Sequence, residues 1–169
     1  TDETTSSGVN IYRYSQSNAA LFGGETSIRF HPESIQWMQL VSSFSSVIGK
    51  KENGEYLPFI PAHKFRNEIQ LKRKKLDFLH EPALTLSAIT ALAQNHPSPF
   101  ETPTPGYTLI NLNINAELII SKQHWLLGIT ATNLFDKKYI DHLSTLKPMN
   151  YSNPGRNISL MVTIPFEIN

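Results

Sequence analysis

Long runs of alternating apolar and polar residues constrain the fold of this chain more than any other feature of its sequence. In residues 107–120 the even positions from Ile110 to Ile120 are apolar, while positions 111, 113 and 115 are asparagine and position 117 is glutamate. Residues 157–168 alternate in the same way, with every even position apolar. Because successive side chains of a strand point to opposite faces, this pattern predicts long strands with one apolar and one polar face.

Turn-forming residues divide the chain into seven segments with this alternation. The predicted strands cover about residues 9–30, 36–48, 63–74, 82–94, 107–120, 125–135 and 157–168. Their connections alternate between short ones (31–34, 75–81, 121–124) and long ones (49–61, 95–106, 136–155). Strands of this length approach the roughly 9–11 residues that cross a bilayer in a barrel, and outer-membrane barrels have short turns at one end and long loops at the other. The sequence predicts an all-β fold, an antiparallel up-and-down meander of about seven long strands.

The composition narrows the functional classes. A net charge of +1 provides no field that would attract nucleic acid. Charged residues make up 17% of the chain, below the roughly 25% of a typical soluble domain, which indicates that part of the surface does not face water. The absence of cysteine excludes disulfides, thiolate metal sites and a cysteine nucleophile.

Two segments near the C-terminus carry a family resemblance. The segment ITATNLFDKKYIDHLSTLK, followed by NPGRNISLMVTIPF, resembles the C-terminal end of TonB-dependent outer-membrane receptors. The matching residues run from Asn133 to Tyr139, then Gly155 with Arg156, and finally Phe166 near the end of the last predicted strand. Residues 18–32 also resemble a strand found further upstream in these receptors. One departure is that three residues follow Phe166, whereas many outer-membrane barrels end on the aromatic residue itself.

The resemblance implies that residues 1–169 are the C-terminal part of a transmembrane β-barrel in a larger receptor, with the plug domain and the earlier strands absent. Seven strands are an odd number with two open edges, whereas bacterial barrels have an even number and receptors of this class close with about 22. Such a receptor imports a scarce nutrient, such as an iron–siderophore, haem or a similar chelate, across the outer membrane of a Gram-negative cell. The implied partners are outer-membrane lipid, the receptor's own plug domain, a TonB-type energy-coupling protein and the nutrient chelate, and no nucleic acid.

Three groups of residues are candidates for function. The long loops hold candidates for contact with the ligand: Tyr56, Phe59, His96, His142 and Tyr151. One face of the fifth predicted strand holds candidates that would line a barrel lumen or face a plug: Asn111, Asn113, Asn115 and Glu117. Phe166 resembles the terminal aromatic residue that the barrel-assembly machinery reads. The simpler readings are solvated loop histidines, aromatic anchors at the membrane interface, an exposed polar sheet face and a lipid-facing phenylalanine.

Other patterns and alternatives carry less weight. The chain contains no GxSxG, HExxH or glycine-rich phosphate-binding motif, so we expect no enzyme activity, catalytic residue, cofactor or resident metal. Histidines in or beside the long loops, His63, His96 and His142, are compatible with metal contact, although an imidazole that bonds to solvent is the commoner case. The basic run 72–75 fits a solvated lumen rim better than an anionic partner. Two alternatives stay open, a piece of a passive porin-like channel and a soluble β-sandwich that binds a ligand.

Overall fold

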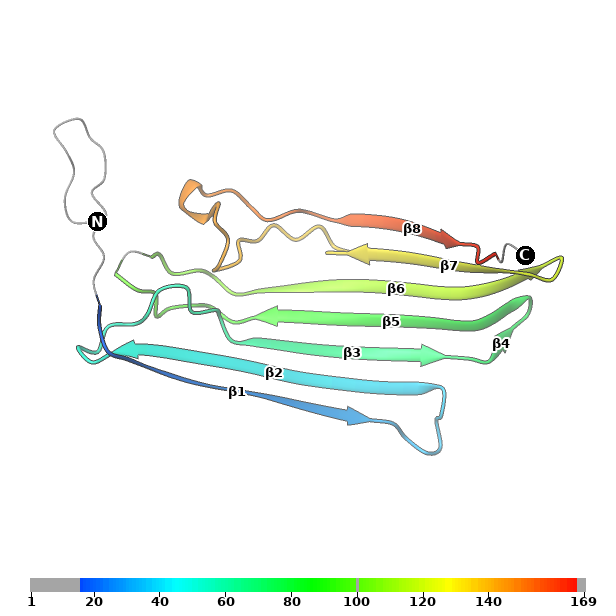
Figure 1. Ribbon diagram of the computed structural model, residues 1–169, viewed down its shortest axis with the longest axis horizontal. Helices are drawn as coiled ribbons and strands as arrows, with labels where there is room; N and C mark the ends of the chain where they lie inside the picture. The colour runs from blue at the N-terminus through cyan, green and yellow to red at the C-terminus, as the bar shows by residue number, and fades with distance from the viewer. Residues whose placement is uncertain (1–15, 100, 167–169) are drawn as a thin grey trace.

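Eight strands pair in an antiparallel sheet that follows the order of the chain (Figure 1). The structure is a computed structural model that describes residues 16–99 and 101–166. The strands are β1 (Ala19–Phe30), β2 (Met38–Lys51), β3 (Lys64–Lys72), β4 (Lys75–Leu76), β5 (Leu79–Ala91), β6 (Tyr107–Ile120), β7 (Gln123–Thr132) and β8 (Asn157–Thr163). Seven of them are neighbours in the order β1-β2-β3-β5-β6-β7-β8, and β4 pairs with β5. The predicted all-β antiparallel meander is confirmed, as a sheet that is not closed.

The connections alternate in length as the sequence predicts. The long connections β2–β3, β5–β6 and β7–β8 gather at one end of the sheet, and the short turns lie at the other end (Figure 1). The last long connection contains a single turn of 3-10 helix, η1 (Lys147–Met149). Within the described residues no helix has the length and apolar character needed to cross a membrane.

Several predicted strand boundaries were wrong. The first strand begins at Ala19 within the described part of the chain, and the predicted residues 9–15 lie outside that part. The predicted turn 75–81 is instead a tight hairpin in which β4 pairs with the start of β5, which raises the number of strands to eight. Asp77 has a positive φ of 51° in this hairpin, and a bulge follows between His80 and Ala83, where Pro82 has no amide to donate.

Two other strands are shorter than predicted. β7 ends at Thr132 and not at residue 135, because Asn133 turns the chain into the left-handed region with a φ of 50°. β8 ends at Thr163, although the alternation continues to residue 168. The last pair is Thr163 with Leu126, although β7 continues three residues further, to Gln123. Pro165 has no amide to donate to a ladder, which agrees with the end of pairing here. Residues 167–169 lie outside the described part of the chain.

The register aligns apolar side chains into rows that cross the sheet. One row contains a residue from each of the seven long strands: Phe30, Leu40, Ile69, Leu86, Leu112, Ala131 and Ile158. The neighbouring row toward the short turns is Met38, Leu71, Leu84, Ile114, Ile129 and Leu160. We call the face that carries these rows the apolar face. Its side chains are long-range neighbours because the register does not shift between these rows, since a shift by one residue would move every side chain to the opposite face.

The opposite face is polar. A row on this face contains Gln39, Gln70, Thr85, Asn113, Thr130 and Ser159. Side chains within it bond to one another, because Gln70 Nε2 donates to Thr85 Oγ1 at 3.5 Å and Asn113 Nδ2 donates to Thr130 Oγ1 at 2.8 Å. We call this the polar face.

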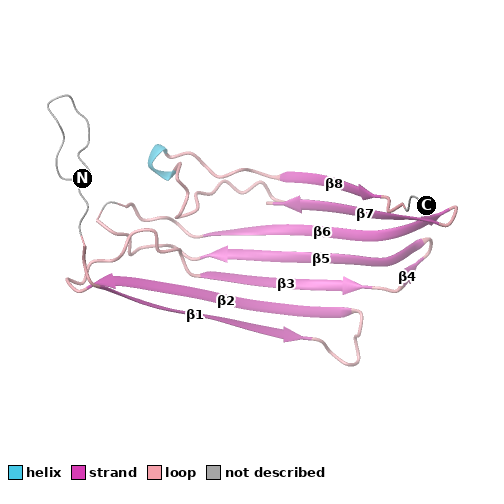
Figure 2. Ribbon diagram, viewed as in Figure 1, coloured by secondary structure: helices cyan, strands magenta, loops and turns pink. Residues whose placement is uncertain are grey.

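No second layer covers either face within the described residues, which form one sheet and a single turn of helix (Figure 2). Ala91 and Ala131 are the only apolar residues that are buried in this part of the chain. The large apolar side chains of the apolar face stay exposed, as Phe30, Leu86 and Leu160 illustrate. This arrangement differs from a β-sandwich, in which two sheets bury their inner faces against each other. Within the described residues the apolar face is therefore not buried.

Candidate functional site

The three long loops interlock at one end of the sheet, and Glu101 connects all three. Its Oε1 accepts the amide of Phe59, from the β2–β3 loop, at 2.9 Å. Its Oε2 accepts the amide of Ser98, in its own loop, at 3.2 Å and lies 3.8 Å from Nε2 of His142, in the β7–β8 loop. One carboxylate thus ties together segments that are distant in the sequence.

His142 is the most deeply placed of the candidate ligand residues, with 5% of its surface exposed. Its Nδ1 lies 2.8 Å from Thr104 Oγ1 and 3.2 Å from Lys147 Nζ. The Lys147 ammonium also donates to the carbonyl of Thr102 at 2.8 Å. Because an ammonium group only donates, Nδ1 must accept, which leaves the proton of a neutral imidazole on Nε2, facing Glu101. We call Glu101, Thr104, His142 and Lys147 the loop cluster.

A second carboxylate, Asp141, fastens the β7–β8 loop to the sheet. Its Oδ2 accepts from Lys64 Nζ at 3.2 Å and from the Tyr107 hydroxyl at 2.5 Å. Tyr139 adds its ring to Tyr107, with the two ring centroids 4.5 Å apart. The amide of Asp141 donates to Asn153 Oδ1 at 2.8 Å, so the outgoing and returning halves of the loop are joined as well.

The electrostatics favour the neutral imidazole and the ionised carboxylates. Burial and the nearby Lys147 ammonium lower the pKa of His142 below its ordinary value of 6.5, although Glu101 and Asp141 oppose this. Burial alone would raise the pKa of Glu101, but the hydrogen bonds from the Phe59 and Ser98 amides outweigh it and leave that pKa lowered. Burial would likewise raise the pKa of Asp141, but the hydrogen bonds from the Tyr107 hydroxyl and the Leu143 amide outweigh burial. The pKa of Asp141 is therefore also lowered.

These shifts predict that acid loosens the loops. His142 binds a proton less readily in the folded state than in the unfolded chain. The stabilisation of the docked loops by neutral His142 is therefore complete above about pH 6.5, and it is lost as the pH falls through the lowered pKa of His142. We expect the Phe59 amide, which Glu101 binds, to exchange its hydrogen faster as the pH falls below about 6.5, after correction for the intrinsic pH dependence of exchange. The His142→Gln variant is the control. The prediction fails if that variant keeps the same change between about pH 6.5 and 5.

The two segments that carry the family resemblance meet at the base of the β7–β8 loop. Asn133 is buried, and its side chain bonds to both backbone groups of Lys137. Asn133 Oδ1 accepts the Lys137 amide at 2.8 Å, and Asn133 Nδ2 donates to the Lys137 carbonyl at 2.9 Å. Asp136 Oδ1 accepts the amide of Arg156 at 2.9 Å. A Cβ atom on Gly155 would lie 2.5 Å from the same oxygen, so the close approach requires glycine there. The residues of both segments therefore form one structural lock.

The structure brings some of the predicted ligand residues together and separates others. Tyr56 and His96 stack with ring centroids 4.8 Å apart, and Lys50 Nζ lies 4.7 Å from the Tyr56 ring. Phe59 presents its side chain to the exterior with 76% of its surface exposed, and Tyr151 is 61% exposed. His142 is buried in the loop cluster, so its imidazole is occupied by protein contacts. Ligand contact by these residues remains a prediction.

The predicted lumen-facing residues lie together on the polar face of β6. Asn113 and Asn115 bond to each other, and Glu117 bonds to His124 of β7. Asn111 Oδ1 accepts the amide of Asn133 at 2.9 Å, which connects the polar face to the structural lock. Whether a lumen or a plug adjoins these residues remains a prediction.

Phe166 is the last described residue and lies beyond the end of β8, with 76% of its surface exposed. Its exposure leaves the ring accessible, and its role as an assembly signal remains a prediction.

Five residues that hold the loops together were not predicted from the sequence: Glu101, Thr104, Asp141, Lys147 and Lys64. No spacing in the sequence connects them, because their partners belong to different loops and strands. The Asn133–Lys137 contact is the exception, since an asparagine that bonds backbone groups four residues on is a local motif. Among the described residues no group of three histidine, aspartate or glutamate side chains is arranged to hold a metal ion.

The described part of the chain has the architecture of a β-barrel wall, an antiparallel meander of long strands with opposite faces apolar and polar. No protein-family model matches the sequence. Among solved structures the chain is similar to a copper transporter, OprC, with a TM-score of 0.68 and 19% sequence identity. The match covers 86% of this chain and 23% of that one, so the chain spans less than a quarter of the length of the transporter. At this identity the likeness establishes the fold.

Proposed function

We propose that this chain forms part of the barrel wall of an outer-membrane receptor that imports a scarce nutrient with energy supplied from the inner membrane. The observation that carries the proposal is the exposed apolar face, which crosses seven long strands and is not covered by any other described residues. In water such a face would be an aggregation liability, whereas in a bilayer it meets hydrocarbon. The proposal is supported by the resemblance to TonB-dependent receptors and by the fold shared with a transporter.

The strand lengths and the free edges agree with a membrane setting. β2 and β6 contain 14 residues each, and β5 contains 13, against roughly 9–11 residues for one crossing. The outer edges of β1 and β8 are unpaired in the described sheet. Lipid does not tolerate unpaired backbone groups, so we infer that further strands close the barrel. A plug domain in the same receptor is what the resemblance to TonB-dependent receptors implies.

The loop end of the sheet is the proposed outer face. Its exposed aromatic side chains, Phe59 and Tyr151, would meet the nutrient there, together with Tyr56 and His96. The nutrient would be an iron–siderophore, haem or a similar chelate, and the fold shared with a copper transporter adds copper to these candidates. Asn111, Asn113, Asn115 and Glu117 would face the lumen and the plug, and Phe166 would serve barrel assembly. No enzyme activity forms part of the proposal.

The orientation can be tested with cysteines, because the chain has none of its own. Tyr151 on a long loop and Phe78 at a short turn are similarly exposed, at 61% and 71%. In the full-length protein, a membrane-impermeant maleimide is expected to label Tyr151→Cys on intact Gram-negative cells, and Phe78→Cys only after lysis. Labelling of both variants on intact cells, or recovery of the protein in the soluble fraction, would contradict the proposal.

A transport assay separates the active receptor from the porin-like alternative. Uptake of labelled iron–siderophore, haem or copper by cells that express the full-length protein is expected to stop when the energy-coupling protein is deleted. Uptake that continues without that protein would favour a passive channel.

A further inference from the structure

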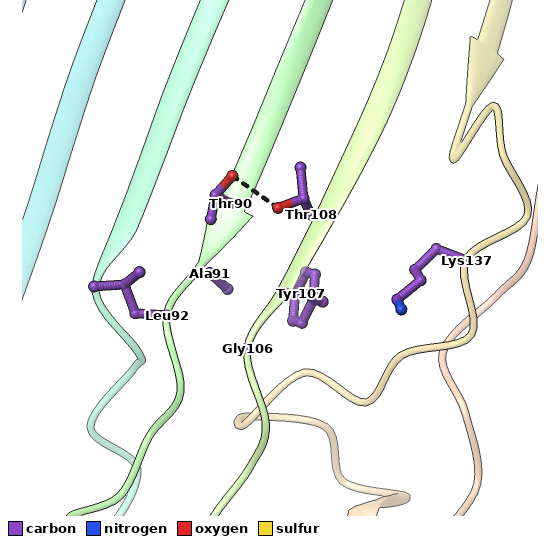
Figure 3. A pocket seen from close by; sticks show the side chains of 7 residues that line it. All are labelled: Thr90, Ala91, Leu92, Gly106, Tyr107, Thr108 and Lys137. Atoms are coloured by element: carbon purple, nitrogen blue, oxygen red, sulfur yellow. Dashed lines mark hydrogen bonds between the residues drawn. The ribbon is translucent and has the colours of Figure 1, made fainter.

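A shallow hollow of about 500 Å³ lies where the β5–β6 and β7–β8 loops leave the sheet (Figure 3). Thr90, Leu92, Thr108 and Lys137 are among the residues that line it. Gly106 forms part of its wall, where a Cβ atom would lie 2.9 Å from the carbonyl oxygen of Ala91. The hollow thus combines a cation, hydroxyl groups and an apolar side chain in one place.

The register places the hydroxyl groups on the apolar face. Thr90 pairs with Phe65 and with Thr108, and Phe65 pairs with Phe44, so the four side chains form one row. The rings of Phe44 and Phe65 contact each other at 4.6 Å between centroids. The row is therefore partly aromatic and partly hydroxylated. The next row toward the short turns still contains two polar residues, Ser42 and Asn67, and the rows of Leu86 and Leu84 beyond it are wholly apolar.

The depth of this row matches the edge of a membrane. Thr108 lies ten residues before Leu118, which belongs to the apolar face near the short turns. At about 3.3 Å per residue and a tilt of about 40° the two are about 25 Å apart along the membrane normal, which is the height of the apolar band of an outer-membrane barrel. The hollow would lie where hydrocarbon gives way to headgroups at the outer side.

The polar groups that line the hollow can make further hydrogen bonds. Thr90 Oγ1 and Thr108 Oγ1 are 3.0 Å apart, and one hydroxyl proton satisfies that contact, so the other is free to donate. The Lys137 ammonium makes no hydrogen bond or ion pair with any residue in the described ranges. The adjacent carboxylate of Asp136 accepts the Arg156 amide, and Asp141 is paired with Lys64 and Tyr107.

We propose that this hollow binds the phosphate of an anionic lipid headgroup, with Lys137 as the cation and the threonine pair as the hydroxyl donor. The inference rests on the proposed membrane setting. An acyl chain would continue past the Phe44–Phe65 pair toward the apolar rows, where apolar area adds to the attraction of one charge. A free anion lacks that second contribution, which is why we assign the hollow to a lipid.

The test uses the full-length protein in vesicles of phosphatidylcholine with a minor fraction of phosphatidylglycerol. Flotation with phosphatidylcholine vesicles reports membrane insertion alone and so tests the proposed function separately. Bound phosphatidylglycerol is then counted by native mass spectrometry after extraction. Lys137→Gln is expected to reduce the retained phosphatidylglycerol about fivefold, the contribution of one lysine at an anionic surface, and Thr108→Val is expected to reduce it less.

Lys138→Gln is the matched control, because Lys138 is the next residue, is exposed and does not line the hollow. It should retain phosphatidylglycerol like the parent protein. Equal losses in the two lysine variants would overturn the proposal, as would equal retention of phosphatidylcholine and phosphatidylglycerol. Displacement of the lipid by inorganic phosphate at millimolar concentration would show a site for the free anion, which also overturns it.

Discussion

Replacement of Leu86 by arginine is expected to destabilise the folded protein in a bilayer by about 2–4 kcal/mol, the cost of an arginine on the lipid-facing surface of a barrel near its midplane. Leu86 belongs to the apolar row that crosses all seven long strands, and its side chain is 38% exposed. Its row lies near the middle of the apolar band, between the short turns and the row of Thr108. The measurement is the free energy of unfolding by guanidinium in lipid vesicles.

Thr85→Arg is the matched control, since Thr85 is the preceding residue of β5 and lies on the polar face. It loses a single long hydrogen bond of 3.5 Å from Gln70, so we expect its free energy of unfolding to fall by about 1 kcal/mol or less. Equal destabilisation by the two arginines would mean that lipid does not contact the apolar face. A larger loss for Thr85→Arg would reverse the assignment of the two faces.

Replacement of Asn133 by alanine is expected to cost about 2–4 kcal/mol, from two lost side-chain hydrogen bonds and from the poorer tolerance of positive φ by alanine than by asparagine. Asn133 is buried, has a φ of 50° and bonds both backbone groups of Lys137. The variant leaves the amide and carbonyl of Lys137 without these partners. We expect the loss in the free energy of unfolding to be accompanied by faster hydrogen exchange in the β7–β8 loop.

Two further variants separate the causes. Asn133→Gly removes the bonds but relieves the strain, so it should be less destabilising than Asn133→Ala. Asn133→Asp keeps the acceptor for the Lys137 amide and loses only the donor. If all three variants matched the parent protein in stability, the structural lock would have no energetic role.

The alternation of apolar and polar residues predicted the ends of some strands and not of others. The alternation in β6 predicted both ends of that strand correctly, Tyr107 and Ile120, because a strand with one apolar face repeats every two residues. It failed at the end of β8, where Ile164 and Phe166 continue the pattern but pairing has stopped. Periodicity reports which face a side chain prefers, while the length of a strand also depends on backbone pairing, for which Pro165 has no amide to donate.

The candidate site was less predictable than the sheet. The long loops were predicted to hold the ligand-contact residues, and two of these, Tyr56 and His96, lie with their ring centroids 4.8 Å apart, although their role remains a prediction. The same reasoning gave no sign that His142 would be buried between Lys147 and Glu101. A loop residue is exposed or buried according to which other loops pack on it, and composition does not report this.

The order of residues is sufficient to predict the all-β fold, the two faces of the strands and the alternation of short turns with long loops, because each of these depends on side chains within one strand or one turn. The register that aligns the rows and the contacts that join the loops depend on how distant segments pack. Lys64 meets Asp141 across 77 positions of the sequence, and Glu101 meets Phe59 across 42. Contacts at such separations form only after the strands between them have paired, because pairing brings the ends of those strands to the same edge of the sheet.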